Sequence, residues 1–306
     1  MHSEPLVSVI IPAYNAANFL PYQLDALASQ LNAPPFEVIV ADNGSTDHIQ
    51  AVIDNYKNKL NISLIDASDK KGQSYARNLA VFKASTNYIL ACDADDVVSP
   101  NWVSSLSQYI LNEDCIVTTP LLPFYPHLGE SPETAPESRK THEMLLGLNK
   151  FPFAQGGSAA YRRSSFIEVG GFDESFQGGS EDIDLSWRIT DSGRNLYFCE
   201  KSWLYYRARE NEGNTFLQVY RYARENVLLW KRCKTRGKVI NSVSFKIAVI
   251  RALAIPYLYA RHRKVEDFAS YGGRVGALVG NIKYRLLQKK NSPHFIWDSI
   301  PEAEYS

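Results

Sequence analysis

Short apolar runs alternate with segments of helical periodicity over the first 120 residues. Four runs rich in branched apolar side chains have the length of buried strands: 6–11, 36–41, 62–65 and 88–92. Three stretches between them place apolar side chains three and four positions apart, as on a helix face: 17–31, 48–60 and 72–84. Ser99 and Pro100 then suit the start of a further helix. This alternation is typical of βαβ units and predicts an α/β fold with a mostly parallel sheet.

The pattern changes in the later part of the chain. Residues 120–142 are rich in Pro, Glu, Ser and Thr with little periodicity, which favours a long surface loop able to close over a site. Helical spacing returns beyond residue 205. Its apolar face consists of Phe216, Val219, Tyr220, Ala223, Val227 and Trp230. We therefore predict one domain over residues 1–210 and a C-terminal helical region over residues 211–306.

Polar residues gather in three loops that follow predicted strands. Residues 12–15 read Pro-Ala-Tyr-Asn, residues 42–47 read Asp-Asn-Gly-Ser-Thr-Asp, and residues 93–96 read Asp-Ala-Asp-Asp. Open α/β sheets bind ligands at the carboxyl ends of their strands. The second loop could instead be a plain turn with Asp47 capping the next helix. The carboxylates of the third loop repel one another unless a cation compensates them, and such oxygens suit Mg²⁺ or Mn²⁺ bridging to a phosphate.

The charges are unevenly distributed. The chain of 306 residues has no formal net charge, but residues 1–200 hold 13 Lys or Arg against 25 Asp or Glu, and residues 201–306 hold 20 against 8. An acidic first part argues against a nucleic acid partner. The basic second part suits an anionic surface, a lipid head group or a phosphate. The alternative is that the two parts attract each other.

Cysteine usage and hydropathy bear on the compartment. The four cysteines are too far apart for a metal knuckle or a CxxC redox pair, so we expect reduced thiols in the cytoplasm. The first apolar run ends at Pro12 without a basic segment before it, and no apolar stretch reaches 18 residues. We expect neither a signal peptide nor a membrane span.

Five segments together resemble the family 2 glycosyltransferases of the GT-A fold. They are VSVIIPAYN, VIVADNGSTD, GQSYARN, ILACDADD and GGSAAYRRSSFIEVGGFDESFQGGSEDIDLSWR, in the family's order and spacing. The resemblance implies a Rossmann-like, mostly parallel central sheet flanked by helices. It also implies inverting transfer of a sugar from a nucleotide diphosphate donor, UDP by family habit, to an acceptor hydroxyl.

The resemblance assigns a donor side. Its residues would be Pro12, Ala13, Tyr14, Asn15, Asp42, Asn43, Gly44, Gly72, Arg77, Asn78, Asp93 and Ala94. Residues 12–15 would lie along the nucleoside and Asp42 would bind the base. Residues 77–78 would face the base and pyrophosphate, unless they only form an exposed helix face. Asp95, with Asp93, would be the main ligand of the divalent cation, Mn²⁺ or Mg²⁺.

The resemblance also assigns an acceptor side. Inversion by single displacement needs a base opposite the leaving diphosphate, and the implied base is Asp182, with Glu181 orienting the acceptor. Two adjacent carboxylates should raise at least one pKa, which suits a base that works near neutral pH. Alternatively, both only favour the N-terminus of the following helix. Gly156, Gly157 and Ser158 would line the acceptor side.

One segment departs from the family pattern. Many relatives carry a His after the next strand as a further metal ligand, whereas residues 203–209 of this chain contain none. Either Asp95, Asp93, the diphosphate and water hold the cation, or Arg207 and Arg209 supply positive charge to the diphosphate.

Several alternatives concern activity and partners. The chain lacks the QxxRW motif of processive synthases, so we expect single additions to a carbohydrate, a glycolipid or another hydroxyl acceptor. A nucleotidyltransferase would need a Gly-rich basic loop after its first strand, and a non-catalytic nucleotide-sugar-binding scaffold would not need both acidic pairs. The apolar segment 243–260, flanked by basic residues, either contacts the inner face of an anionic membrane peripherally or forms a packed cap or homodimer surface.

Overall fold

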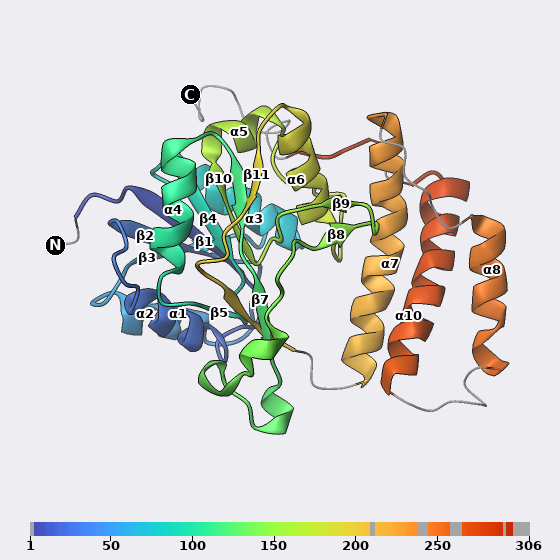
Figure 1. Ribbon diagram of the computed structural model, residues 1–306, viewed down its shortest axis with the longest axis horizontal. Coiled ribbons are helices and arrows are strands. Elements are labelled where there is room, and N and C mark those ends of the chain that lie inside the picture. Colours follow the sequence, from blue (N-terminus) through green and yellow to red (C-terminus); the bar gives the residue numbers. More distant parts are fainter. Residues whose placement is uncertain (1–2, 209–211, 238–243, 258–264, 290–291, 296–306) are drawn as a thin grey trace.

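A seven-stranded sheet forms the centre of the computed structural model, which describes residues 3–208, 212–237, 244–257, 265–289 and 292–295 (Figure 1). The strand order is β11-β6-β10-β4-β1-β2-β3. The strands are β1 Val7–Ala13, β2 Phe36–Asp42, β3 Asn61–Asp66, β4 Tyr88–Cys92, β6 Ile116–Thr118, β10 Ser158–Arg162 and β11 Leu196–Phe198. Only β10 runs antiparallel to its neighbours in this sheet. The predicted α/β fold with a mostly parallel sheet is thus confirmed.

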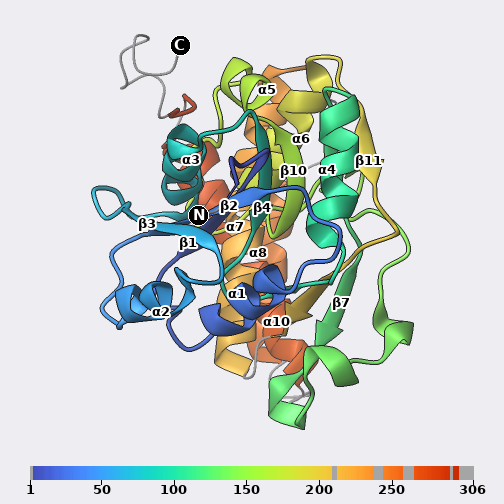
Figure 2. The same cartoon turned by 90° about the vertical axis from the view of Figure 1, so that its left-hand side faces the viewer.

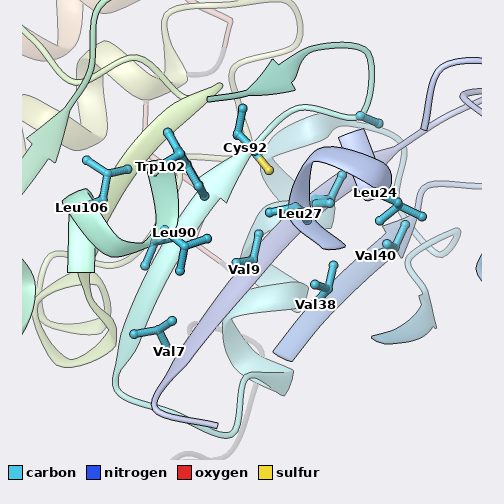
Figure 3. Packing of buried hydrophobic residues seen from close by; sticks show 14 of the residues in the cluster. Val7, Val9, Leu24, Leu27, Val38, Val40, Leu90, Cys92, Trp102 and Leu106 are labelled. Atoms are coloured by element: carbon cyan, nitrogen blue, oxygen red, sulfur yellow. The ribbon is translucent and has the colours of Figure 1, made fainter. Parts of the chain in front are cut away.

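Helices cover both faces of this sheet (Figure 2). They are α1 Leu20–Ala28, α2 Ile49–Tyr56, α3 Gln73–Lys83, α4 Trp102–Asn112, α5 Arg163–Glu168 and α6 Glu181–Asp191. Successive side chains of a strand point to opposite faces, so Val9 packs toward Leu24 and Trp102 of α1 and α4 (Figure 3). Ile10 packs on the other face, where α3, α5 and α6 lie. Because both faces are covered, the central strands β1 and β4 carry apolar side chains on both faces, with Ser8 as an exception in β1.

Two helix N-termini differ from the sequence analysis, one in the N-cap that was expected and one in the N-cap that was offered as an alternative. Helix α4 begins at Trp102 with Asn101 as its N-cap. Ser99, which was expected to cap it, instead shares a hydrogen bond of 2.8 Å with the hydroxyl of Ser202. Asp47 does not cap α2, because its Oδ2 accepts the backbone N–H of Ala17 at 2.7 Å. Both polar side chains connect distant segments rather than ending a helix.

The stretch expected as a surface loop over residues 120–142 contains regular structure. It holds β7 Leu121–Phe124 and the 3-10 turns η1 Pro126–Leu128, η2 Pro132–Thr134 and η3 Glu137–Arg139. β7 is parallel to β12 (Leu204–Arg207), which is also antiparallel to β5 (Val97–Val98). The hairpin of β8 (Leu146–Gly147) and β9 (Phe151–Pro152) follows. The three-stranded sheet of β5, β12 and β7 brings the residues after β4 next to those around residue 205.

Helices beyond residue 211 form a separate layer beside the sheet (Figure 1). Those within the described residues are α7 Glu212–Thr235, α8 Phe245–Leu253, α10 Val265–Gly280 and the π-helical η4 Asn281–Leu286. α10 packs tightly along α7, since a Cβ added to Gly276 would lie 2.2 Å from the carbonyl oxygen of Tyr220. The neighbouring Val219 and Val227 also meet glycines of α10. The predicted apolar face of α7 is therefore the face that contacts α10.

Ion pairs join this helical layer to the rest of the chain. Arg232 pairs with Asp173 at 2.9 Å, and Arg236 pairs with Asp184 at 3.0 Å. These contacts support attraction between the acidic and basic parts. The predicted division at residue 210 stays a prediction, since residues 209–211 lie outside the described ranges. Among the helices described, none is long and apolar enough to cross a bilayer.

Candidate active site

A cleft of about 930 Å³ lies between the central sheet and α7. We call one side the sheet wall, formed by residues 71–74 with Arg77, Asp93 and Asp96. We call the other side the helical wall, formed by residues 176–183 and the α7 residues Leu217, Gln218, Arg221, Tyr222 and Asn226. Gly156 and Gly157 line the cleft between the two walls. The cleft thus lies where an open sheet places its ligands.

The loop after β2 shapes the sheet wall through Asn43. Its Oδ1 accepts the N–H of Gly72 at 2.8 Å, and its Nδ2 donates to the carbonyls of Ala67 at 2.6 Å and Lys70 at 2.8 Å. Gly72 has a φ of +139°, which L side chains rarely adopt. The asparagine therefore holds the loop before α3 at the cleft, in a conformation that a glycine accepts.

The residues expected along the nucleoside lie beside the cleft rather than among its lining residues. Asn15 Oδ1 accepts the N–H of Thr46 at 2.7 Å, and Asp42 Oδ1 accepts the N–H of Ser45 at 2.8 Å. The loops after β1 and β2 are thus bonded to each other, with the Tyr14 side chain 59% exposed. Contact of residues 12–15 and 42–44 with a nucleoside stays a prediction.

Arg77 connects the two walls. Its Nη2 donates to Asp93 Oδ1 at 2.6 Å, and its Nη1 donates to Glu181 Oε1 at 3.1 Å. The side chain is only 2% exposed. Burial opposes the charge, but the carboxylates of Asp93, Glu181 and Asp182 outweigh this effect and raise the pKa of the guanidinium. Arg77 is therefore a permanent buried cation between acidic groups, not part of an exposed helix face.

Two consecutive glycines make this arrangement possible. A Cβ on Gly156 would lie 2.7 Å from Arg77 Nη1, which is closer than packing allows. A Cβ on Gly157 would lie 3.1 Å from Asp93 Oδ2 and 3.4 Å from Asp96 Oδ2. The absence of side chains here makes room for the guanidinium and lets both carboxylates reach the same part of the cleft.

Glu181 and Asp182 begin α6 after an unusual loop. Gly178, Gly179 and Ser180 all have positive φ, at 158°, 122° and 72°. The half-buried Asp182 accepts the N–H of Gly156 at 3.0 Å through Oδ2 and the N–H of Ile183 at 2.8 Å through Oδ1. The backbone thereby fixes the direction of the Asp182 carboxylate in the cleft.

Both carboxyl groups have raised pKa values. Burial is the main cause for Glu181 and, together with the charge of Asp182, raises its pKa to about 7, although Arg77 opposes the shift. Burial also raises the pKa of Asp182, against the hydrogen bond from Gly156 and the charge of Arg77. The expected effect of two adjacent carboxylates is therefore present. A group with such a pKa can accept a proton near neutral pH.

The contribution of α7 to the helical wall was not anticipated from the sequence. A Cβ on Gly179 would lie 2.4 Å from Tyr222 Cδ1, so α7 packs directly on the loop before Glu181. Ser180 Oγ donates to Asn226 Oδ1 at 3.0 Å. Gln218, Tyr222 and Asn226 lie four residues apart on α7 and face the cleft. This polar spacing was visible in the sequence, but nothing local tied it to residues 178–182.

Two predicted site residues are corrected by the structure. Asn78 is fully buried, and its amide exchanges hydrogen bonds with the backbone of Phe172 at 2.8 and 3.0 Å. It therefore holds that segment against α3 instead of facing a nucleotide. Ser158 is also fully buried, and its hydroxyl bonds Trp102 Nε1 at 2.8 Å and the Thr119 hydroxyl at 2.6 Å. Its hydrogen bonds connect β10 to α4 and to the residue that follows β6, and it does not line the acceptor side.

The acidic loop after β4 differs in detail from the expectation. Asp93 and Asp96 line the cleft, Ala94 is buried, and Asp95 is half-buried and does not line it. No cluster of three or more His, Cys, Asp or Glu side chains with metal-binding geometry occurs among the described residues. Two carboxylates plus the phosphates of a substrate are nevertheless a usual coordination sphere for Mg²⁺, so Asp93 and Asp96 fit a hard divalent cation.

Arg207 is occupied away from the cleft. Its guanidinium lies 4.9 Å from the ring centre of Phe19 and 5.0 Å from that of Phe124. Its Nε donates to the Asp95 carbonyl at 3.0 Å, and its backbone N–H donates to Asp96 Oδ1 at 2.9 Å. In this position it orients the acidic loop, and direct contact with a diphosphate stays a prediction. Arg209 lies outside the described residues.

Comparison with known proteins defines the class. The family model "Glycosyl transferase family 2" matches residues 8–170, and the chain belongs to this family of glycosyltransferases. A second model, described as "N-terminal domain of galactosyltransferase", matches residues 149–210.

The individual relatives are distant. A chondroitin synthase of Pasteurella multocida is 26% identical over 85% of this chain and 28% of its own length. This chain spans 23–36% of the first curated relatives. Among solved structures, a Pyrobaculum calidifontis mannosyltransferase with GDP-mannose and Mn²⁺ has a TM-score of 0.58 at 15% identity, covering 94% of this chain and 88% of that one. Staphylococcus aureus TarS with UDP-GlcNAc has a TM-score of 0.54 at 18% identity, covering 92% of each chain. These structures show the GT-A fold.

Proposed function

We propose that this chain transfers a single sugar from a nucleotide diphosphate donor to an acceptor hydroxyl, with inversion at the anomeric carbon. The observation that carries this proposal is the bridge through Arg77. It sets Asp93 on the sheet wall and the Glu181–Asp182 pair on the helical wall across one cleft. A donor on the sheet wall would then have its anomeric carbon facing a carboxylate that can accept a proton.

The sheet wall is the proposed donor side. Gly72 and Lys71 line it, so a diphosphate would meet a side-chain-free backbone and a cation. The solved neighbours include proteins described in complex with UDP-GlcNAc and with GDP-mannose and Mn²⁺, which supports a nucleotide-sugar donor. Asp93 and Asp96 would hold a divalent cation, which when bound supplies positive charge to the leaving diphosphate. The geometry favours Asp96 over Asp95 as the partner of Asp93 in this role.

Asp182 is the proposed base. The acceptor oxygen forms a bond to the anomeric carbon while the bond to the diphosphate breaks, and the diphosphate leaves with the electron pair. The hydroxyl proton goes to Asp182, whose carboxylate is oriented by the N–H groups of Gly156 and Ile183. Glu181, which accepts a hydrogen bond from Arg77, would position Asp182 and the acceptor. We assign the role of base to Asp182 and not to Glu181 because Glu181 is only 6% exposed, whereas Asp182 is half-buried in the cleft.

The helical wall is the proposed acceptor side. Gln218, Arg221, Tyr222 and Asn226 of α7 surround the Glu181–Asp182 pair with hydrogen-bonding groups. Such groups match the hydroxyls of a carbohydrate, and the curated relatives include enzymes named for polysaccharide synthesis. A carbohydrate or glycolipid acceptor is the proposed class.

The activity can be tested with the purified chain. UDP-, GDP- and dTDP-sugars are each incubated with Mn²⁺ and oligosaccharide acceptors, and the released nucleotide diphosphate is measured. We expect release with one nucleotide class, stimulated by an acceptor and lost in Asp182→Asn. The anomeric configuration of the product, read from its proton coupling in NMR, tests inversion. Retention of configuration would contradict the single displacement, and no binding of any donor would contradict the proposed function.

A further inference from the structure

Helix α8 is the outermost of the C-terminal helices, with α10 between it and α7 (Figure 1). Ala248 is fully buried on the side that packs. Ile247, Ile250 and Leu253 are 46%, 67% and 75% exposed. At 100° per residue these three side chains lie on the side of the helix opposite Ala248. Helix α8 thus presents an apolar strip that the described part of the chain does not cover.

Positive charges accompany this strip. Lys246 and Arg251 lie within and beside it on the same helix, both exposed and without an ion pair among the described residues. The sequence has no Asp or Glu from residue 244 to residue 257. Over residues 213–289 it has 16 Lys or Arg and three Asp or Glu. We call Lys246, Ile247, Ile250, Arg251 and Leu253 together the α8 face.

We propose that the α8 face docks on the surface of a lipid bilayer that carries anionic head groups. Exposed apolar side chains with basic neighbours on one helix face are the composition of helices that lie in the membrane interface. The apolar side chains enter the boundary between head groups and acyl chains, while Lys246 and Arg251 contact lipid phosphates. The charge distribution favours this orientation, since the acidic residues 1–200 are repelled by the same surface.

The charges disfavour a second copy of this chain as the occupant. In a two-fold symmetric dimer, the same surface patch meets itself. Lys246 and Arg251 would then face their own counterparts with no carboxylate on the α8 face to compensate them. A bilayer with anionic lipid supplies that compensation, and it accepts the apolar side chains without requiring a complementary shape. The docking surface is independent of the proposed function, because no residue of the α8 face lines the cleft.

The test is flotation of the full chain with vesicles. One set contains phosphatidylcholine alone and the other contains phosphatidylcholine with phosphatidylglycerol. We expect flotation with the anionic vesicles, at least about tenfold weaker binding to the neutral ones, and loss of binding in high salt. Lys246→Glu with Arg251→Glu should remove the preference for anionic lipid. Ile250→Ser with Leu253→Ser should weaken binding to anionic vesicles by at least about tenfold.

A matched control separates the α8 face from exposed apolar residues in general. Leu31 and Leu128 are 58% and 64% exposed and lie on the sheet-containing part, so Leu31→Ser with Leu128→Ser should leave flotation unchanged. Thermal melting of each variant checks that it is folded. The proposal is overturned if the wild type does not float, or if both serine variants behave alike. It is also overturned if light scattering shows a dimer that Ile250→Ser with Leu253→Ser dissociates.

Discussion

The two walls of the cleft are built in different ways. The sheet wall consists of loops at the carboxyl ends of parallel strands, where Asn43 and Arg77 hold neighbouring loops through side-chain hydrogen bonds. The helical wall comes from a loop with three positive φ angles and from one face of α7, joined by the close contact of Gly179 with Tyr222. The comparison shows that a regular sheet can present the proposed donor groups, whereas the proposed base depends on packing between distant segments.

The largest expected effect is on turnover, and it tests the role of the helical wall in the chemical step. Asp182→Asn keeps the shape of the side chain but removes its ability to accept a proton, so turnover should fall by about 10³-fold. Initial rates of nucleotide diphosphate release at saturating donor and acceptor measure this loss. Asp191→Asn, at the far end of the same helix α6, serves as the control and should keep its turnover. A turnover of Asp182→Asn near that of wild type would remove Asp182 from the role of base.

A second prediction concerns the bridge between the walls. Arg77→Met leaves the buried Glu181 and the half-buried Asp93 without their cation, so the free energy of unfolding should fall by about 3–5 kcal/mol. Urea unfolding at neutral pH measures it. The surface pair of Arg139 and Glu130, 2.7 Å apart, supplies the control, since Arg139→Met should change the free energy of unfolding far less than Arg77→Met does. Equal effects of the two substitutions would contradict the structural role of Arg77.

A third prediction tests the packing of α10 against α7, the helix that contributes to the helical wall. Gly276→Ala places a Cβ against the Tyr220 carbonyl and should destabilise the protein by about 1–3 kcal/mol. Gly273→Ala meets only Val219 Cγ1 at 3.5 Å, an ordinary contact. It should be neutral or stabilise by up to about 1 kcal/mol, because alanine favours helix more than glycine. Urea unfolding of both variants measures these two changes in stability. A Gly276→Ala variant as stable as the Gly273→Ala variant would refute the close approach of α10 to α7.

A fourth prediction is a pH dependence of stability that comes from Glu181. Its pKa is raised from 4.5 to about 7 in the folded chain. Between these values the native state binds more protons than the unfolded state, so the free energy of unfolding should fall as pH rises through this window. Glu181→Gln should flatten that slope. Urea unfolding at several pH values between 5 and about 8 tests this expectation, and an unchanged slope in the variant would contradict a raised pKa at Glu181.

Most of the sheet-containing fold was predictable because its signals are local. The runs at 6–11, 36–41 and 88–92 are apolar since both sheet faces are covered, and the polar loops after them mark the strand ends. Strand β7 escaped detection, since its four residues include Pro123 and lie in a segment otherwise rich in turn formers. Its pairing with β12, more than 80 residues away, leaves no local pattern.

The site was predictable only in part, because contacts between segments that are distant in the sequence leave no local pattern. The resemblance to the family brought Arg77, Asp93, Glu181 and Asp182 together, and the structure places them around one cleft. Asn78 and Ser158 share those motifs but serve packing, because each is buried and satisfied by neighbouring groups. The α7 residues of the helical wall could not be found, since a helix signal does not say which of its faces meets which loop.

The central claim is that the sheet wall binds the donor and that Asp182 acts in the chemical step. The most direct measurement is calorimetric titration with Mn²⁺ present, using whichever of UDP, GDP or dTDP the wild type binds. Asp93→Asn and Asp182→Asn are titrated alongside it. The account predicts that Asp93→Asn binds the nucleotide much more weakly, while Asp182→Asn binds it as the wild type does. Loss of binding in Asp182→Asn with full binding in Asp93→Asn would contradict it.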